Sequence, residues 1–129
     1  MSRAQQMAAL AELADARFRA EQGKLAAIRR RMGEVETQLA ELARARSGRP
    51  ALAPNDPAAR AGADLKWQSW IETRLKALNM ELARLRAQEA EERARLAKLF
   101  GQSVAAQRLS ERLAEEDERQ GEARAERQW

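Results

Sequence analysis

The chain contains neither cysteine nor histidine. Without cysteine it cannot build a disulfide framework, and without both residue types it lacks the ligands of the usual structural zinc sites. Its serine hydroxyls also have no histidine to act as their base. These absences remove several common catalytic and metal-binding arrangements, and they are compatible with a reducing compartment.

Aromatic residues are also scarce. Only 4% of the 129 residues are aromatic, although 44% are hydrophobic and 34% are charged. This composition, rich in alanine and leucine, supplies few side chains that could fill a wide globular core. We therefore expect residues 1–129 to form a single elongated unit and not two domains.

Long apolar runs are absent as well. No stretch approaches the roughly 20 apolar residues that a membrane-spanning helix needs. The segment from Met1 to Arg19 scatters charged residues among alanines, unlike a signal peptide. We expect a cytoplasmic protein that reaches the inner face of the membrane only through partners. The 24 basic and 20 acidic residues are intermixed, which indicates a solvated surface with salt bridges and argues against a nucleic-acid footprint.

The chain does contain two apolar stripes, with residues three and four apart, on either side of its only prolines. The first consists of Leu25, Ile28, Met32, Val35, Leu39 and Leu42, and the second of Ile71, Leu75, Leu78, Leu82 and Leu85. An average spacing of 3.5 residues places one narrow seam along a helix, which must be buried on another helix. The sequence therefore predicts an all-α fold, a long two-helix antiparallel coiled-coil hairpin.

Local signals set the expected boundaries. The first helix should cover about residues 2–46, with Ser2 as its N-cap, and the second should cover about residues 64–126. A connector over about residues 47–63 separates the two helices.

Turn residues mark this connector. Ser47, Gly48 and Pro50 are expected to end the first helix, since glycine suits the turn after a helix and proline cannot continue one. Asp56 followed by Pro57 predicts either a short helix or an early start of the second long helix.

Pairing the stripes in opposite directions gives each apolar layer an apolar partner. The layers are Leu42 with Ile71, Leu39 with Leu75, Val35 with Leu78, Met32 with Leu82, and Ile28 with Leu85. A competing register slides the second helix by about three turns and places Asp64 and Ala61 against the end of the first stripe. We prefer the first register, because it leaves no apolar layer without a partner.

The preferred register also predicts a polar layer. Glu89 and Glu92 occupy seam positions opposite the stretch from Glu21 to Leu25, where the first stripe is interrupted. Apolar contact should resume beyond it, through Met7, Leu10, Ala14 and Phe18 on the first helix and Leu96, Leu99 and Phe100 on the second.

Motifs that serve catalysis are missing. The glycines are isolated, and none belongs to a phosphate-binding loop. Acidic pairs such as Glu91 and Glu92 lie on a helix with cationic neighbours, so we interpret them as a solvated face. We expect no catalytic residue, no cofactor site, no metal site and no enzymatic activity.

Two groups of residues are candidates for partner contacts. Trp67 and Trp70 open the second helix, where they either anchor a partner or fold over the hairpin tip. The tail from Leu109 to Trp129 keeps Leu109 and Leu113 at helical spacing and then becomes densely charged. This tail is either a docking segment or a frayed chain end.

The two helices, the proline-bearing connector, the tryptophan pair and the ending Leu109-Ser-Glu-Arg-Leu113-Ala-Glu-Glu-Asp-Glu-Arg119 together resemble the FliJ/YscO family. Members of that family are central-stalk proteins of flagellar and type III secretion export ATPases. The resemblance implies a non-enzymatic stalk that binds a hexameric ATPase ring and links it to the membrane export gate.

The resemblance also implies where such partners would bind. The ring would be contacted by Arg108, Leu109, Arg112, Leu113 and Arg119. Trp67 and Trp70 would face the export gate or other export factors such as chaperones.

Two other classes of function remain open. One is a generic scaffold, in which two hairpins form a four-helix bundle that buries Leu10, Leu13 and their neighbours. The other is a coiled coil that associates with nucleic acid through its arginines, whose binding would weaken steeply with salt.

Overall fold

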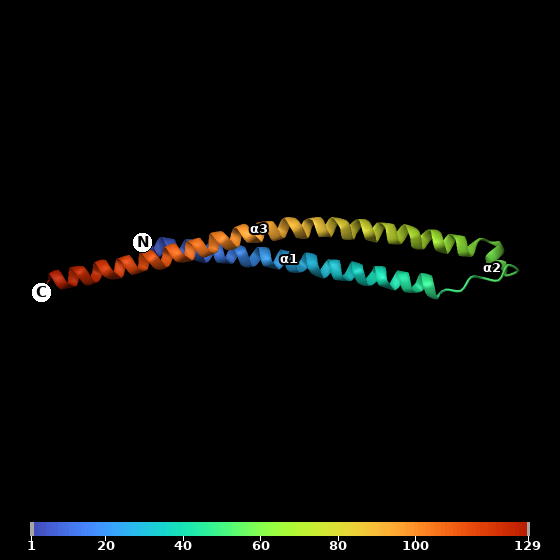
Figure 1. Cartoon of the computed structure of the whole chain (residues 1–129), viewed down its shortest axis with the longest axis horizontal. Helices are drawn as coiled ribbons and strands as arrows, with labels where there is room; N and C mark the ends of the chain where they lie inside the picture. The colour runs from blue at the N-terminus through green and yellow to red at the C-terminus, as the bar shows by residue number, and fades with distance from the viewer. Residues whose placement is uncertain (1, 129) are drawn as a thin grey trace. The chain divides into compact units, whose positions relative to one another are not determined.

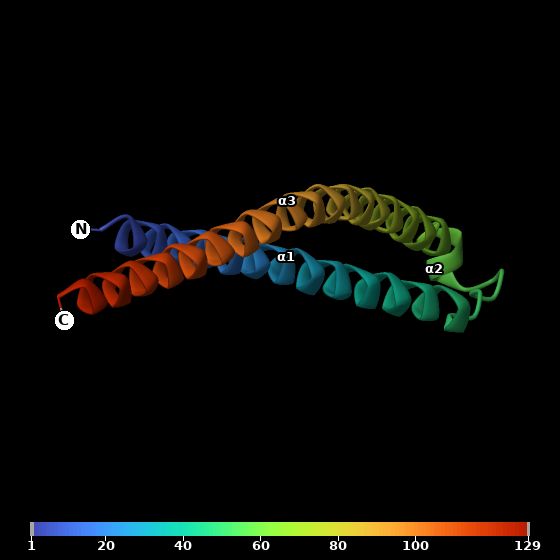
Figure 2. The same ribbon diagram turned by 60° about the vertical axis from the view of Figure 1, so that its left-hand side comes forward.

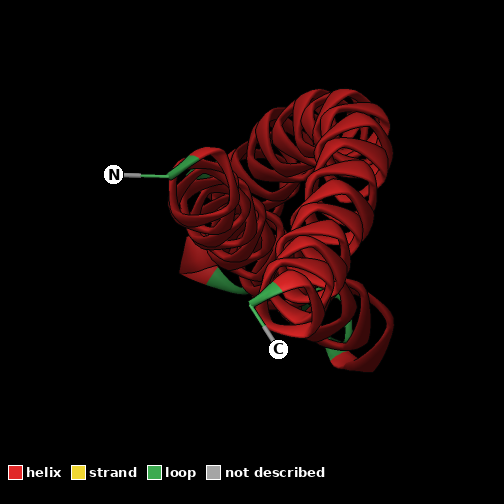
Figure 3. Cartoon of the chain, turned by 90° about the vertical axis from the view of Figure 1, so that its left-hand side faces the viewer, coloured by secondary structure: helices red, strands yellow, loops and turns green. Residues whose placement is uncertain are grey.

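A computed structural model describes residues 2–128 of the chain. This part consists of three helices, α1 (Arg3–Gly48), α2 (Pro57–Arg60) and α3 (Ala63–Arg127), joined by loops and without a strand (Figure 1, Figure 3). The predicted all-α class is confirmed. Within residues 2–128, no helix is both long and apolar enough to cross a membrane.

The start of α1 is fixed by a reciprocal cap. The Gln5 backbone N–H donates to Ser2 Oγ at 3.1 Å, and the Ser2 N–H donates to Gln5 Oε1 at 2.9 Å. This capping box satisfies two backbone donors that have no partner inside the helix. The predicted N-cap at Ser2 is therefore correct.

The end of α1 lies two residues beyond the expected position. Ser47 does not break the helix, because its hydroxyl donates to the carbonyls of Ala43 and Arg44, at 3.1 and 3.3 Å. Serine can bond back to the preceding turn in this way while its backbone stays helical. Gly48 is the last helical residue, and Pro50 lies in the loop that follows.

The connection to α3 contains its own short helix, α2, which is visible beside the loop in Figure 2. Asp56 caps it by accepting a 2.8 Å hydrogen bond from the Ala58 N–H, and Pro57 takes the first turn. Gly62 then adopts a φ of 77°, a left-handed conformation that glycine adopts without strain. A separate short helix therefore precedes α3, which begins at Ala63 and not at Asp64.

The chain divides into two compact units. Unit 2 comprises Ala27–Ala90, and unit 1 comprises Met1–Ala26 together with Glu91–Trp129. The core of unit 2 combines both apolar stripes. Val35, Leu78, Leu82 and Leu85 are buried, and Ile28, Met32, Leu39 and Leu42 pack against them.

Ion pairs in unit 2 agree with the preferred register. Arg31 contacts Glu81 at 2.7 Å, one residue away from the layer that pairs Met32 with Leu82. Arg29, on the preceding turn of α1, contacts Glu89 at 3.2 Å. The competing register would move these groups about three turns apart, beyond the reach of their side chains.

Unit 1 restores apolar contact, as expected, through several of the predicted residues but not all of them. The Phe18 and Phe100 rings lie 5.6 Å apart, and Leu25 and Leu99 are buried. The prediction for Leu10 is wrong, because this side chain is 55% exposed. Ala11 is buried in its place, since it lies three residues before Ala14 and keeps the seam spacing.

The seam positions keep a regular spacing even where their residues are polar. Along each long helix, one continuous series of buried or half-buried positions alternates three and four residues apart, and other half-buried residues such as Arg31 and Glu81 flank it. On α1 they are Ala4, Met7, Ala11, Ala14, Phe18, Glu21, Leu25, Ile28, Met32, Val35, Leu39 and Leu42. On α3 they are Ile71, Leu75, Leu78, Leu82, Leu85, Glu89, Glu92, Leu96, Leu99, Ser103, Ala106, Ser110 and Leu113. The spacing continues through the acids, so the interruption near Glu21 is one of polarity and not of geometry.

Candidate functional site

The C-terminal part of α3 carries the residues predicted to bind a ring. Arg108, Arg112 and Arg119 are exposed, and none of them forms an ion pair with another residue in the range 2–128. Leu109 is exposed as well, because the seam passes through Ser110, whereas Leu113 is half-buried as the last apolar seam residue. These five residues therefore combine free cations with one uncovered leucine.

Helix α3 continues beyond that point without cover. From residue 114 to residue 128 every side chain is exposed except the half-buried Ala123. The backbone nevertheless stays helical as far as Arg127. The predicted docking segment is therefore an ordered helix in its described part, while Trp129, its predicted aromatic end, lies outside the described residues.

A shallow groove of about 450 Å³ lies in unit 1 beside these residues, and Arg108 is one of its walls. Its lining also includes Ala11, Glu12, Asp15, Ser103, Val104, Gln107 and Glu111. The seam residues Ala11 and Ser103 are small, so they leave space between the helices that a leucine would fill. Sequence reasoning missed this groove, although small residues at both seam positions signal it.

Arg49 organises the connector side of unit 2. Its guanidinium lies 4.2 Å from the centre of the Trp67 ring and 3.6 Å from Asp64 Oδ1. Asp64 Oδ2 also accepts a 3.1 Å hydrogen bond from the Leu52 N–H. These contacts fasten the loop after α1 to the first turn of α3 through an ion pair, a cation–π contact and a backbone hydrogen bond.

The two tryptophans therefore have different environments. Trp67 is half-buried under Arg49, whereas Trp70 is 58% exposed and Leu65 is exposed still further. Trp67 thus helps to close the connector, while Trp70 and Leu65 present an apolar surface. The role of Arg49 was not predicted, because nothing local in the sequence links it to a residue 15 to 18 positions away.

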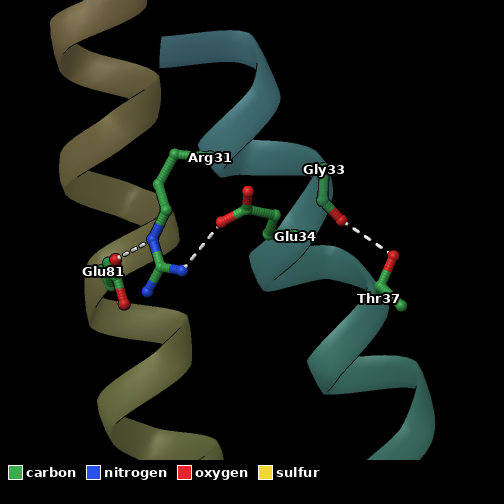
Figure 4. A network of polar contacts seen from close by, with 5 residues as sticks. All are labelled: Arg31, Gly33, Glu34, Thr37 and Glu81. Atoms are coloured by element: carbon green, nitrogen blue, oxygen red, sulfur yellow. Dashed lines mark hydrogen bonds and ion pairs between the residues drawn. The ribbon is translucent and has the colours of Figure 1, made fainter. Parts of the chain in front are cut away.

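Arg29 and Arg31 of α1 form ion pairs inside unit 2, and Figure 4 shows those of Arg31. Arg31 Nε donates to Glu81 Oε1 at 2.7 Å, and its Nη1 donates to Glu34 Oε2 at 3.1 Å. The bonded guanidinium of Arg31 lowers the pKa of the Glu81 carboxyl. On the far side of the same turn, Thr37 Oγ1 donates to the Gly33 carbonyl at 2.9 Å. Arg31 thus acts as a bridge between α1 and α3.

The polar layer of unit 1 contains a pair of carboxyl groups. Glu92 is only 4% exposed, as predicted for a seam position, and it shares the layer with the half-buried Glu21. Interaction with the Glu21 carboxyl, followed by burial, raises the pKa of Glu92, while interaction with Glu92 and then with Lys24 lowers the pKa of Glu21. Glu89, in unit 2, also lies at its predicted seam position, but it is half-buried and paired with Arg29.

Within residues 2–128, no group of three or more acidic side chains is placed to hold a metal ion. Comparison of the chain with protein families, curated proteins and solved structures gives no match.

Proposed function

We propose that this chain is a non-enzymatic coiled-coil stalk that binds a hexameric protein-export ATPase and couples it to a membrane export gate. In this proposal α1 and α3 pair as an antiparallel coiled-coil hairpin in the cytoplasm. The strict alternation of three and four residues on both seams supports such a coiled coil. The order of the ion pairs in unit 2 supports the antiparallel direction, since Arg31 meets Glu81 and Arg49 meets Asp64.

The observation that carries the proposal is the uncovered C-terminal part of α3. After its apolar seam ends, α3 stays helical while nearly all of its side chains are exposed. This surface is therefore open to a partner. The free guanidinium groups of Arg108, Arg112 and Arg119 suit acidic loops lining a ring, since arginine forms forked hydrogen bonds with carboxylates. Leu109 adds an apolar anchor beside them.

The connector side would meet a different partner. Trp70 and Leu65 expose apolar surface close to the rigid contact between Arg49 and Trp67. Tryptophan on an ordered support is a frequent anchor of protein interfaces. We assign this surface to the export gate or to an export chaperone.

The test is the rate of ATP hydrolysis by a cognate export ATPase. A protein truncated after Leu113 keeps the whole seam but loses Arg119 and the uncovered part of α3, so it should remain helical and fold normally while stimulating the ATPase less. Reversing the charge of Arg108, Arg112 and Arg119 to glutamate should have the same effect, and salt should weaken residual binding. Trp70→Ala should leave stimulation intact.

Arg93→Glu provides the matched control, because Arg93 is an exposed arginine of unit 1 outside the proposed surface. Full stimulation by the truncated protein would exclude the part of α3 after Leu113 as the ring contact. A complete lack of stimulation by the intact chain would exclude the stalk function.

A scaffold function is the second candidate, favoured by one observation. Leu10 and Leu13 are both more than half exposed on α1, where a second hairpin could cover them in a four-helix bundle. A dimer by sedimentation that dissociates on Leu10→Gln with Leu13→Gln, together with no ATPase stimulation, would favour the scaffold.

A further inference from the structure

The carboxyl pair in the seam of unit 1 has no part in the proposed partner surfaces. Glu92 lies on α3 and Glu21 on α1, and each carboxyl shifts the pKa of the other. Glu92 Oε1 and Glu21 Oε2 are buried without a hydrogen-bond partner, while Arg95 and Lys24 contact the other oxygen of each group. Leucine is the ordinary residue at such seam positions. Because two acids stand there instead, the packing of the seam depends on whether they are protonated.

Cations surround the pair on both helices. Lys24 Nζ lies 2.8 Å from Glu21 Oε1 on α1, and Arg95 Nη2 lies 3.3 Å from Glu92 Oε2 on α3. Arg17 and Lys98 line a cavity of about 190 Å³ together with Glu21, Arg95, Leu99 and Gln102. These four cations favour one ionised carboxylate, but they lie on the exposed sides of the pair.

Two carboxyl groups can share a hydrogen bond only while one of them holds a proton. An ionised carboxylate accepts hydrogen bonds and cannot donate one. Without the shared proton, two negative charges would face each other in a buried seam, as in other paired carboxylates.

We infer that Glu21 and Glu92 form a protonation-controlled latch within unit 1, in which a single proton holds α1 and α3 together at the polar layer. Loss of this proton loosens the seam around the two residues. Protonation tightens it without any ligand. The latch is independent of the proposed stalk function.

The direction of the pH dependence follows from the two carboxyl groups. Because the pKa of Glu92 is raised in the folded chain, Glu92 contributes folding stability that is fully present below pH 4.5, its ordinary pKa. This contribution is lost as the pH rises through the raised pKa of Glu92. The lowered pKa of Glu21 has the opposite effect, which is lost only as the pH falls below 4.5. The latch is therefore tightest in mildly acidic solution and opens towards neutral and alkaline pH.

The experiment measures amide hydrogen exchange of the intact chain between pH 5 and pH 8, corrected for the intrinsic pH dependence of exchange. In the wild type, protection over residues 17–26 and 91–99 should fall several-fold as the pH rises. Glu92→Gln mimics the protonated acid, since its amide can donate to Glu21 at every pH. This variant should keep its protection across the range.

Glu81→Gln is the control, because Glu81 belongs to unit 2 and its substitution should leave the pH response of unit 1 unchanged. An equal fall in protection in wild type and Glu92→Gln would overturn the latch.

A second measurement does not depend on the folding of a variant. Carbon-13 NMR of the wild-type glutamate carboxyls should show one group that titrates above the ordinary range and is coupled to a second group. Independent titration of Glu21 and Glu92 at ordinary values would also refute the inference.

Discussion

Val35 and Leu78 are two of the three most enclosed seam residues of unit 2, with 0% and 1% of their surface exposed, and Ile71, also at 1%, is the third. Most other seam residues are only half-buried, as expected where two helices alone cover each other. The stability of unit 2 should therefore depend unusually strongly on these three positions.

Val35→Asp should destabilise unit 2 by at least about 3 kcal/mol, because it buries a charge without a partner. Thr37→Asp is the matched control, since Thr37 is exposed two residues away and threonine and aspartate have similar helix propensities. Urea unfolding followed by circular dichroism measures both variants. Equal effects would show that position 35 is not enclosed.

The two seam acids should respond differently to leucine. Glu92→Leu replaces a buried acid by the ordinary seam residue, so it should raise the melting temperature by a few degrees at pH 7. Glu89→Leu should give a smaller rise or none, because it removes the 3.2 Å ion pair with Arg29. Calorimetry distinguishes the two variants, and a higher melting temperature for Glu89→Leu than for Glu92→Leu would contradict this ranking.

At the residue scale, spacing along the helix predicted which residues are buried better than hydrophobicity did. Glu92 was placed in the seam from spacing alone, and it is buried. Leu10 was placed there because it is a leucine, although the spacing from Ala14 selects Ala11. A seam is set by helical geometry, so a small residue in register is buried while a leucine one position away stays exposed.

At the level of elements, the helix starts were predictable and the connector was not. Caps act through side chains two or three residues away, so Ser2 and Asp56 could be recognised from their neighbours. The contacts of Arg49 with Asp64 and Trp67 join residues from opposite sides of the connector. Only a folded chain reveals such a contact.

Asp64→Ala should loosen the connector, because it removes both the ion pair with Arg49 and the acceptor for the Leu52 N–H. We expect faster proteolysis within residues 49–56 and little change in the overall helix content. Glu72→Ala is the control, since its contact with Arg46 is a long one of 3.9 Å between exposed side chains. Cleavage at the same rate in both variants would show that Asp64 does not hold the loop.

At the scale of the whole molecule, the repeated spacing of apolar residues predicted the all-α class. The connector explains why the chain forms two long helices and not one. The direction and register of pairing are open to direct test. Because the chain has no cysteine, introduced pairs report on proximity without competing thiols.

Met32→Cys with Leu82→Cys should oxidise to an intrachain disulfide, because the preferred register makes these residues a layer. Met32→Cys with Ile71→Cys should not, since this pair is close only in the competing register. Electrophoresis without reductant separates the products. Crosslinking of the second pair would reverse the choice of register, and dimers linked between chains would favour the scaffold.

The placement of Arg49 over Trp67 also gives the connector an optical signature. A guanidinium 4.2 Å from the ring centre shields one face of the indole, whereas the more exposed Trp70 meets water directly. In a Trp129→Phe background, collisional quenchers should therefore quench Trp70 more efficiently than Trp67. The emission of Trp67 would then report, without any added label, when the loop after α1 leaves the first turn of α3.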